Sequence, residues 1–536
     1  MKKMKAYFDF MNPKGFRIGI KYAAFFAAIA TGFTLFIMFP VYAQQQASQQ
    51  RTSGIQREAE PGLPARCVSA GYMQDGGTVT QEGKTYTSTK SGVIESVVCV
   101  KNGGWLTLVS PKIRKPKGDK DAGEFGGQGV EAAEASVVNL LDAEIYTETD
   151  GANGLWATNE GSMIYMRGGS ITTFGESAHG MDVTKRASVI LYDMKISTSG
   201  GIACGALVND SGDGTVYATR VTAHTKGYGS PGFYMIGSKS MLTVKDSTIE
   251  AEGSDAGVLL YSADVTVENT VLKGAKGVKV AGGTFTMTGG SLTTTGGDAF
   301  TIVSGEDGPS GGAPGGARGS GAPSGSQGGG SPPQGGMPGG AGGAMGGMAG
   351  SGMPGGSEGG APPGGEIGGG QAGGVMPGGS QGGAPGGAAP GGLFGGARSG
   401  NSTITLKDGV KISASTGNII SVPANNKAAF TASNTDLKGD VIVAETGELS
   451  FTLNKSTLTG KVENAAISMD SSSKWDVTGD SAVTSLSNSS GISGNNVANI
   501  YGNGHTVYYD KGLEENKALG GKTYSLAKGG KLVPKK

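Results

Sequence analysis

The sequence has 536 residues, with 44 basic side chains, 44 acidic side chains and a formal net charge of zero. Proteins that bind nucleic acid use an excess of Lys and Arg to neutralise phosphates, so this balance excludes nucleic acid as an expected partner. The chain contains 102 glycines and three cysteines, and the glycines are concentrated between residues 305 and 400.

Residues 1–43 are typical of a signal peptide. Basic side chains precede an apolar run at residues 22–39, and Val41 and Ala43 stand at the usual cleavage spacing. We expect cleavage after Ala43, which places the mature protein outside the cytoplasm, secreted or on the cell surface. Without cleavage, the apolar run is long enough to span a bilayer, and the protein would contact the membrane only through this segment. The long basic leader resembles the extended signal peptides of some bacterial autotransporters.

A small disulfide-linked β module is expected at residues 67–110, after a flexible polar linker at residues 44–66. The segment between Cys67 and Cys99 shows the alternation of β-strands. In an oxidising compartment two cysteines that flank such a module pair, and closing the loop would stabilise it by about 3 to 4 kcal/mol. Residues 111–130 are expected to be a second linker. The third cysteine, Cys204, is expected to be a small buried hydrophobe.

Repeats predict the architecture of residues 131–304. The phrases LTVKDSTI, VTVENTVL and FTMTGGSL begin at Leu242, Val265 and Phe285, which are 23 residues (265 minus 242) and 20 residues (285 minus 265) apart. Alternation of apolar residues with Thr is typical of half-buried strands. A unit this short cannot close a core alone, whereas stacked units can, so the pattern predicts a parallel β-helix. Asp246 and Asn269 occupy corresponding corners and are expected to stack as a polar ladder.

The repeat stops at residues 305–400, which are rich in Gly, Pro, Ala and Met and are expected to be disordered. Strands of the same pattern resume in the phrases ITLKDGVKI, FTASNTDL and FTLNKSTL. The glycine-rich segment is therefore expected to be an insert in one coil, followed by the C-terminal part of the β-helix at residues 401–482. Residues 483–536 are expected to cap the stack, because an open edge would favour aggregation.

The C-terminal sequence resembles known β-helix families. The phrase SKWDVTGDSAVTSL from Ser473 is similar to the last coils of autotransporter passenger domains. The longer run from Asn499, which contains GGKTY and GGKLVP, resembles the end of secreted β-helix proteins that bind cellulose and pectate. This resemblance implies an all-β, right-handed parallel β-helix of the pectin-lyase-like class that binds carbohydrate or a cell surface without chemistry.

The candidate ligand-binding residues are aromatic, because sugar rings stack on exposed aromatic rings. They are Tyr192, Tyr217, Tyr228 and Tyr234, all in the longer N-terminal coils. Core packing is the alternative interpretation of these side chains.

An enzyme of the pectin-lyase type would instead need several carboxylates that converge on one groove. Asp210 and Asp213 form the densest loop pair and are weak candidates for metal binding, and Asp182 lies near His179. Acidic residues in turns more often form Asx-turns than ligand sets. We therefore expect no catalytic residues, no metal and no cofactor.

The sequence thus predicts a non-catalytic, secreted or surface-exposed β-helix for binding or adhesion. Its expected partner is an extracellular polysaccharide or a ligand on a host or other cell surface. Two alternatives remain: a polysaccharide lyase or hydrolase of the pectin-lyase type, and a structural component of the cell envelope.

Overall fold

The computed structural model describes residues 67, 69–88, 95–117, 127–201, 204–210, 212–253, 257–304 and 401–535. The expected signal peptide (1–43), flexible linker (44–66) and disordered insert (305–400) lie outside these residues. The chain divides into two units, one formed by Met1–Ala317 with Gly392–Lys536 and the other by Arg318–Gly391. All described residues belong to the first unit. Within the described ranges, no helix is long and apolar enough to cross a membrane.

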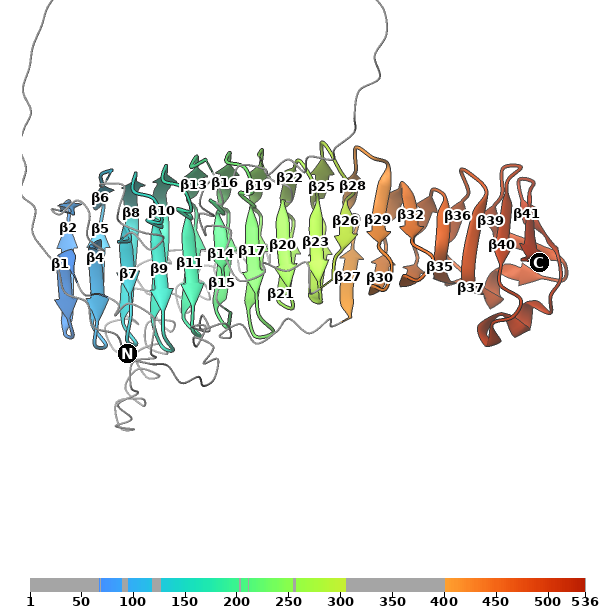
Figure 1. The fold of residues 1–536 in the computed structure, drawn as a ribbon, viewed down its shortest axis with the longest axis horizontal. Coiled ribbons are helices and arrows are strands. Elements are labelled where there is room, and N and C mark those ends of the chain that lie inside the picture. Colours follow the sequence, from blue (N-terminus) through green and yellow to red (C-terminus); the bar gives the residue numbers. More distant parts are fainter. Residues whose placement is uncertain are drawn as a thin grey trace, which may run out of the picture. The chain divides into compact units, whose positions relative to one another are not determined.

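The first unit is a right-handed parallel β-helix, whose strands pair in parallel with those of the coils before and after (Figure 1). Three faces run along it, here called sheets A, B and C. Sheet A contains β1 (Ala70–Asp75), β4 (Ser96–Lys101), β7 (Val130–Ala132), β9 (Leu155–Thr158), β11 (Met181–Thr184), β14 (Leu207–Asn209), β17 (Phe233–Ile236), β20 (Val258–Tyr261), β23 (Val278–Ala281), β26 (Phe300–Ile302), β29 (Asn418–Val422) and β32 (Asp440–Val443).

Sheets B and C follow sheet A in each coil. Sheet B contains β2 (Thr78–Glu82), β5 (Trp105–Val109), β8 (Val137–Thr147), β10 (Met163–Thr173), β12 (Ser188–Tyr192), β15 (Thr215–Thr219), β18 (Met241–Lys245), β21 (Asp264–Glu268), β24 (Gly283–Thr288), β27 (Ser402–Lys407), β30 (Lys427–Ser433) and β33 (Glu448–Asn454). Sheet C contains β3 (Thr85–Thr87), β6 (Lys112–Lys115), β13 (Lys195–Thr198), β16 (Thr222–Thr225), β19 (Thr248–Ala251), β22 (Val271–Gly274), β25 (Ser291–Thr294), β28 (Lys411–Ser413), β31 (Asp436–Lys438), β34 (Thr457–Thr459) and β36 (Lys474–Asp476). The long strands β8 and β10 continue from sheet B into sheet C.

The core lies between the three sheets, where alternate side chains of each strand point inward. Val189 and Leu191 are fully buried and Ile196 is nearly so, as the repeat predicts. Aromatic rings contact one another in the same interior. The ring centroids of Phe285 and Phe300 are 5.6 Å apart in an edge-to-face arrangement, and the stacked rings of Phe430 and Phe451 are 4.8 Å apart and nearly parallel. Burial of these rings supplies much of the hydrophobic stabilisation of the stack.

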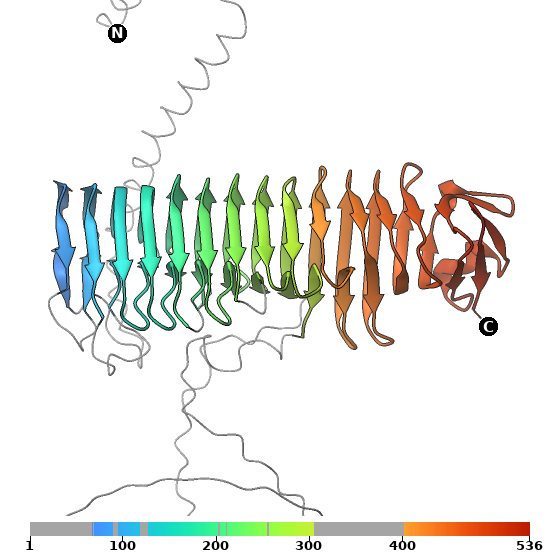
Figure 2. The same cartoon turned by 90° about the horizontal axis from the view of Figure 1, so that it is seen from above.

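The stack continues in register on both sides of residues 305–400 (Figure 2). In sheet B, Thr286 pairs with Thr405, and in sheet A, Phe300 pairs with Ile420. This pairing confirms that both flanks belong to one β-helix. It also completes an outward column of half-buried threonines at corresponding positions of consecutive coils: Thr243, Thr266, Thr286, Thr405, Thr431 and Thr452.

The corner between sheets B and C contains a residue with left-handed backbone conformation. Asp246 has φ of 49° and Asn269 has φ of 47°, values that Asn and Asp tolerate better than most residues. The Asn269 side-chain amide donates to Asp246 Oδ1 over 3.3 Å, which confirms the predicted polar ladder. A second ladder lies directly behind it, since the Ser247 backbone N–H donates to Thr270 Oγ1 over 3.2 Å. These two corners are therefore hydrogen-bonded to each other across consecutive coils.

The expected boundaries at the two ends need correction. The strands of residues 67–110 form the first coils of the β-helix rather than a separate module, because β4 pairs with β7 and β5 pairs with β8. Strand β6 lies within the expected linker 111–130, and β7 begins at the last residue of that linker. The repeat does not reveal these coils, because β4 and β7 begin 34 residues apart (130 minus 96), farther than the repeated phrases.

The C-terminal region first extends the stack and then changes its pairing. Its elements are β35 (Val462–Met469), β37 (Ser481–Ser487), the short helix η2 (Ser489–Gly491), β38 (Ile492–Ser493), β39 (Asn496–Tyr501), β40 (Thr506–Tyr509), the short helix η3 (Glu514–Leu519), β41 (Tyr524–Ala527) and β42 (Lys531–Pro534). β37, β40 and β42 continue the parallel ladder. Antiparallel pairs join β38 to β39 and β41 to β42, so hairpins are added at the end of the stack.

Candidate functional site

Three tyrosines lie on the outer face of sheet B in consecutive coils, and we call Tyr165, Tyr192 and Tyr217 the tyrosine patch. The ring centroids of Tyr165 and Tyr192 are 5.9 Å apart with an interplanar angle of 46°. Tyr217 follows on β15, where it pairs with Ile190, which in turn pairs with Tyr165. The Tyr217 side chain is 43% exposed. The patch thus presents aromatic rings along the stacking direction.

Charged side chains border the tyrosine patch. The Arg220 guanidinium binds both carboxylate oxygens of Asp193, with distances of 2.5 Å from Nε and 3.0 Å from Nη2. This hydrogen bonding holds the pKa of Asp193 below its usual range. Arg167 lies on the other side of the same carboxylate, with 3.8 Å between its Nε and Asp193 Oδ2. Aromatic rings and fixed hydrogen-bonding groups therefore lie side by side on this face of sheet B.

The two remaining candidate tyrosines, Tyr228 and Tyr234, differ in solvent exposure. Tyr228 is 68% exposed and lies in the loop between β16 and β17. Tyr234 is only 1% exposed, contrary to the expectation of an accessible ring. It lies on the outer face of sheet A in a satellite apolar cluster with Val208 and Tyr261, and burial raises its pKa. Tyr234 points outward from its strand, but neighbouring side chains cover its ring and exclude it from solvent.

His179 belongs to a ladder of side chains in the loops between sheets C and A. Gln128 Oε1 accepts from the Asn153 backbone N–H over 2.8 Å, and Asn153 Oδ1 accepts from the His179 N–H over 2.7 Å. His179 Nδ1 then accepts from the Gly205 N–H over 3.1 Å. Burial lowers the pKa of His179 to about 4, so the imidazole is neutral near pH 7. His179 therefore acts as a hydrogen-bond acceptor between consecutive coils.

The sequence contains a signal for this ladder that lies outside the repeated strand phrases. Gln128, Asn153 and His179 are spaced 25 and 26 residues apart, and each is followed by Gly. The glycines are needed for close approach: a Cβ on Gly154 would lie 2.3 Å from the Ile171 side chain and 2.5 Å from the Gly180 carbonyl oxygen. A polar acceptor followed by Gly at the repeat period is therefore the motif of this loop.

The acidic candidates are distributed over different positions. Asp182 is buried on β11, where its register partners are Trp156 and Val208. Asp213 lies in the loop after β14, and its backbone N–H donates to Ser240 Oγ over 3.0 Å. Neither these residues nor Asp210 belong to a group of three or more His, Cys, Asp or Glu ligands in the part of the chain that the structure describes.

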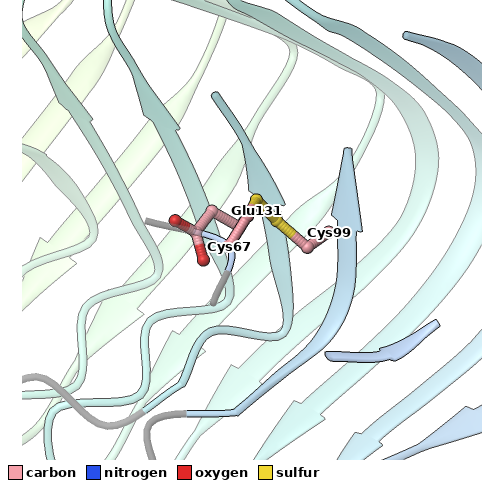
Figure 3. Close-up of side chains that lie close together, drawn as sticks. All are labelled: Cys67, Cys99 and Glu131. Carbon is pink, nitrogen blue, oxygen red and sulfur yellow. A yellow bond between two sulfur atoms is a disulfide. The ribbon is translucent and has the colours of Figure 1, made fainter. Parts of the chain in front are cut away.

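One such group does exist among the described residues, at the N-terminal coils (Figure 3). Cys67 and Cys99 form a disulfide with 5.8 Å between their Cα atoms, which confirms the predicted pairing. Glu131 is the register partner of Cys99 on the next strand of sheet A. Potential ligand atoms of the three residues lie within 4.8 Å of one another, and all three side chains are buried. The sequence did not predict the position of Glu131, because residues 67–110 were expected to form a separate module and the pairing of β4 with β7 was not foreseen.

The third cysteine has a structural position. Cys204 is fully buried, and its Sγ lies 3.2 Å from the Gly175 carbonyl oxygen, to which it donates. Its backbone N–H donates to Ser230 Oγ over 2.9 Å. These contacts agree with the expectation of a small buried side chain.

Comparison with known families agrees with this architecture. Residues 96–296 match a family model described as a right handed beta helix region. No curated protein matches the sequence. The matched residues include the tyrosine patch, the His179 ladder, Cys99 and Glu131. The pairing pattern and the family match together identify the fold as a right-handed parallel β-helix.

Proposed function

We propose that this protein is a non-catalytic, secreted or surface-exposed β-helix that binds an extracellular polysaccharide through the tyrosine patch. The observation that carries the proposal is that Tyr165, Tyr192 and Tyr217 occupy outward positions of sheet B on three consecutive coils. Tyr192 lies one outward position away from the column that Tyr165, Ile190 and Tyr217 form. Their rings offer apolar faces to the C–H faces of sugar rings, and the phenol groups remain available for hydrogen bonds. Burial raises the pKa of Tyr165 above an ordinary value that already lies well above neutral pH, so this hydroxyl is a hydrogen-bond donor.

The scaffold makes the patch suitable for an extended ligand. Coils of a parallel stack repeat at about 4.8 Å, so the three tyrosines extend over roughly 10 Å along the stack. Interstrand hydrogen bonds and the Arg220–Asp193 pair fix the surrounding backbone and side chains. A ligand would therefore bind with little ordering of the protein, which favours affinity from a small contact area.

An extracellular location is part of the proposal. The N-terminal 43 residues have the basic and apolar segments of a signal peptide. The Cys67–Cys99 disulfide is the kind of bond that persists in oxidising compartments. Both features support export, and polysaccharide is abundant outside cells.

A polysaccharide pull-down tests the proposal. The mature chain would be incubated with insoluble cellulose, chitin, peptidoglycan and calcium pectate gel, and the bound fraction measured against protein concentration. We expect at least one polysaccharide to retain the protein, and Tyr217→Ala combined with Tyr192→Ala to weaken that binding at least tenfold. Tyr508→Ala is the matched control, since Tyr508 is 40% exposed on β40, far along the chain from the patch.

The alternative functions predict other results. Release of unsaturated or reducing sugar ends from pectate would assign the protein to the lyases or hydrolases. Failure to bind any polysaccharide or cell surface would favour a structural envelope component. Retention of full binding by the double tyrosine variant would show that another surface is responsible.

A further inference from the structure

The Cys67–Cys99–Glu131 corner combines a disulfide with a buried carboxylate. Cys99 is fully buried, and Cys67 and Glu131 are each 4% exposed. Cys99 and Glu131 are held side by side by the parallel pairing of β4 and β7, so their side chains project outward from neighbouring coils. Cys67 reaches the same place from the segment before β1 (Figure 3). The positions of all three groups are thus fixed by the backbone.

A hydrogen-bond chain orients the Glu131 carboxylate. The Ser96 hydroxyl donates to Glu131 Oε2 over 2.6 Å, and Ser96 Oγ accepts from the Gln128 backbone N–H over 3.1 Å. Outer partners of this kind fix the direction of a metal-binding carboxylate and raise the affinity of a site.

Two thiolates and a carboxylate form a ligand set that zinc-like divalent cations prefer. The sulfurs offer no thiolate charge while they are bonded to each other. After reduction, tetrahedral coordination with Zn–S distances of about 2.3 Å would separate the two sulfurs by about 3.8 Å. The Cα separation of 5.8 Å allows this change through side-chain rotation.

We propose that reduction of the Cys67–Cys99 disulfide converts this corner into a binding site for a zinc-like divalent cation, with both thiolates and the Glu131 carboxylate as ligands. A dithiol breaks the S–S bond by supplying two electrons and two protons, and it leaves as a cyclic disulfide. Metal binding then displaces the two protons from the thiols. Disulfide and metal are therefore alternative states of one site, and the site is independent of polysaccharide binding.

Cobalt is a suitable probe, because thiolate ligands give Co²⁺ an intense near-ultraviolet charge-transfer absorption. The full chain would be reduced with dithiothreitol, desalted without oxygen and titrated with CoCl₂, in parallel with the oxidised chain. We expect one Co²⁺ per reduced chain, displacement by Zn²⁺, and no such band in the oxidised chain. Absence of the band after reduction would overturn the proposal. This holds whether the reduced chain keeps the circular dichroism of the β-helix or loses it.

Variants assign the ligands. Cys67→Ser should abolish the two-thiolate band, whereas Cys204→Ala, the matched cysteine control, should leave Co²⁺ binding unchanged. Glu131→Gln keeps the side-chain volume and the disulfide of the oxidised chain, and we expect it to weaken Co²⁺ binding at least tenfold after reduction. A full band in Cys67→Ser, or equal affinity in Glu131→Gln, would refute the proposed ligand set.

Discussion

Acidification should destabilise the β-helix through His179, and replacement of this residue isolates the effect. In the folded chain the buried imidazole accepts a hydrogen bond from the Gly205 N–H through Nδ1. Protonation of Nδ1 would remove this acceptor and place a charge in the loop ladder. Burial accordingly lowers the folded-state pKa to about 4 from the ordinary value of 6.5.

The sign and magnitude of the effect follow from linkage. Between pH 6.5 and about 4 the unfolded chain binds a proton at this position and the folded chain does not, so the free energy of unfolding falls as the pH falls through this window. Above pH 6.5 both states are neutral, and below about pH 4 the contribution has been lost in full. The separation of the two pKa values corresponds to roughly 3 kcal/mol.

The assay compares wild type with His179→Asn by denaturant unfolding at pH 7.5 and pH 4.5. Asn is the appropriate replacement, because Asn153 already accepts a backbone N–H through Oδ1 on the preceding rung. We expect wild type to lose roughly 2 to 3 kcal/mol more than the variant between the two pH values. Other titrating groups cancel in this comparison. Parallel stability profiles for the two proteins would refute the assignment of His179 as a buried neutral rung.

Three further predictions concern the stack. Val267→Asp should destabilise the fold by roughly 4 kcal/mol or more, because Val267 is fully buried. Thr266→Asp on the outer face is the control and should change the thermal midpoint little. Equal effects of the two substitutions would contradict the inward assignment of Val267. Asn269→Ala should lower the free energy of unfolding by about 2 kcal/mol. Asn269→Gly should lower it by about 1 kcal/mol less than Asn269→Ala does, since Gly adopts positive φ freely. Equal losses in urea unfolding would show that backbone conformation contributes nothing. Deletion of residues 305–400 should leave the calorimetric transition within a few degrees, because the flanking strands pair in register; a collapse of the transition would show that the insert stabilises the fold.

The repeat allowed much of the fold to be predicted, for a physical reason. The alternation of apolar and polar residues along each strand indicates which side chains face the interior. Val189, Leu191 and Ile196 stand at inward positions and are buried as expected. The corner ladder was also predictable, because Asp246 and Asn269 stand at equivalent places in neighbouring repeats.

The candidate sites were less predictable, because they depend on features that alternation does not report. The burial of Tyr234 arises from neighbours on the outer face of sheet A, and the position of Glu131 beside Cys99 depends on a coil with irregular loops. His179 lies in a loop ladder whose hydrogen bonds join different coils. Contacts between coils become visible only once the register of every loop is known.

The left-handed corners have a consequence for how the chain acquires its structure. A non-glycine residue in this conformation is disfavoured by roughly 1 kcal/mol, and the compensating hydrogen bond comes from the adjacent corner. A solitary coil is therefore unfavourable, whereas a coil laid upon a completed one gains its bonds at once. Because the order of coils along the axis follows the order of residues in the chain, growth from a nucleus can proceed like a zipper as the polypeptide emerges, one turn templating the next.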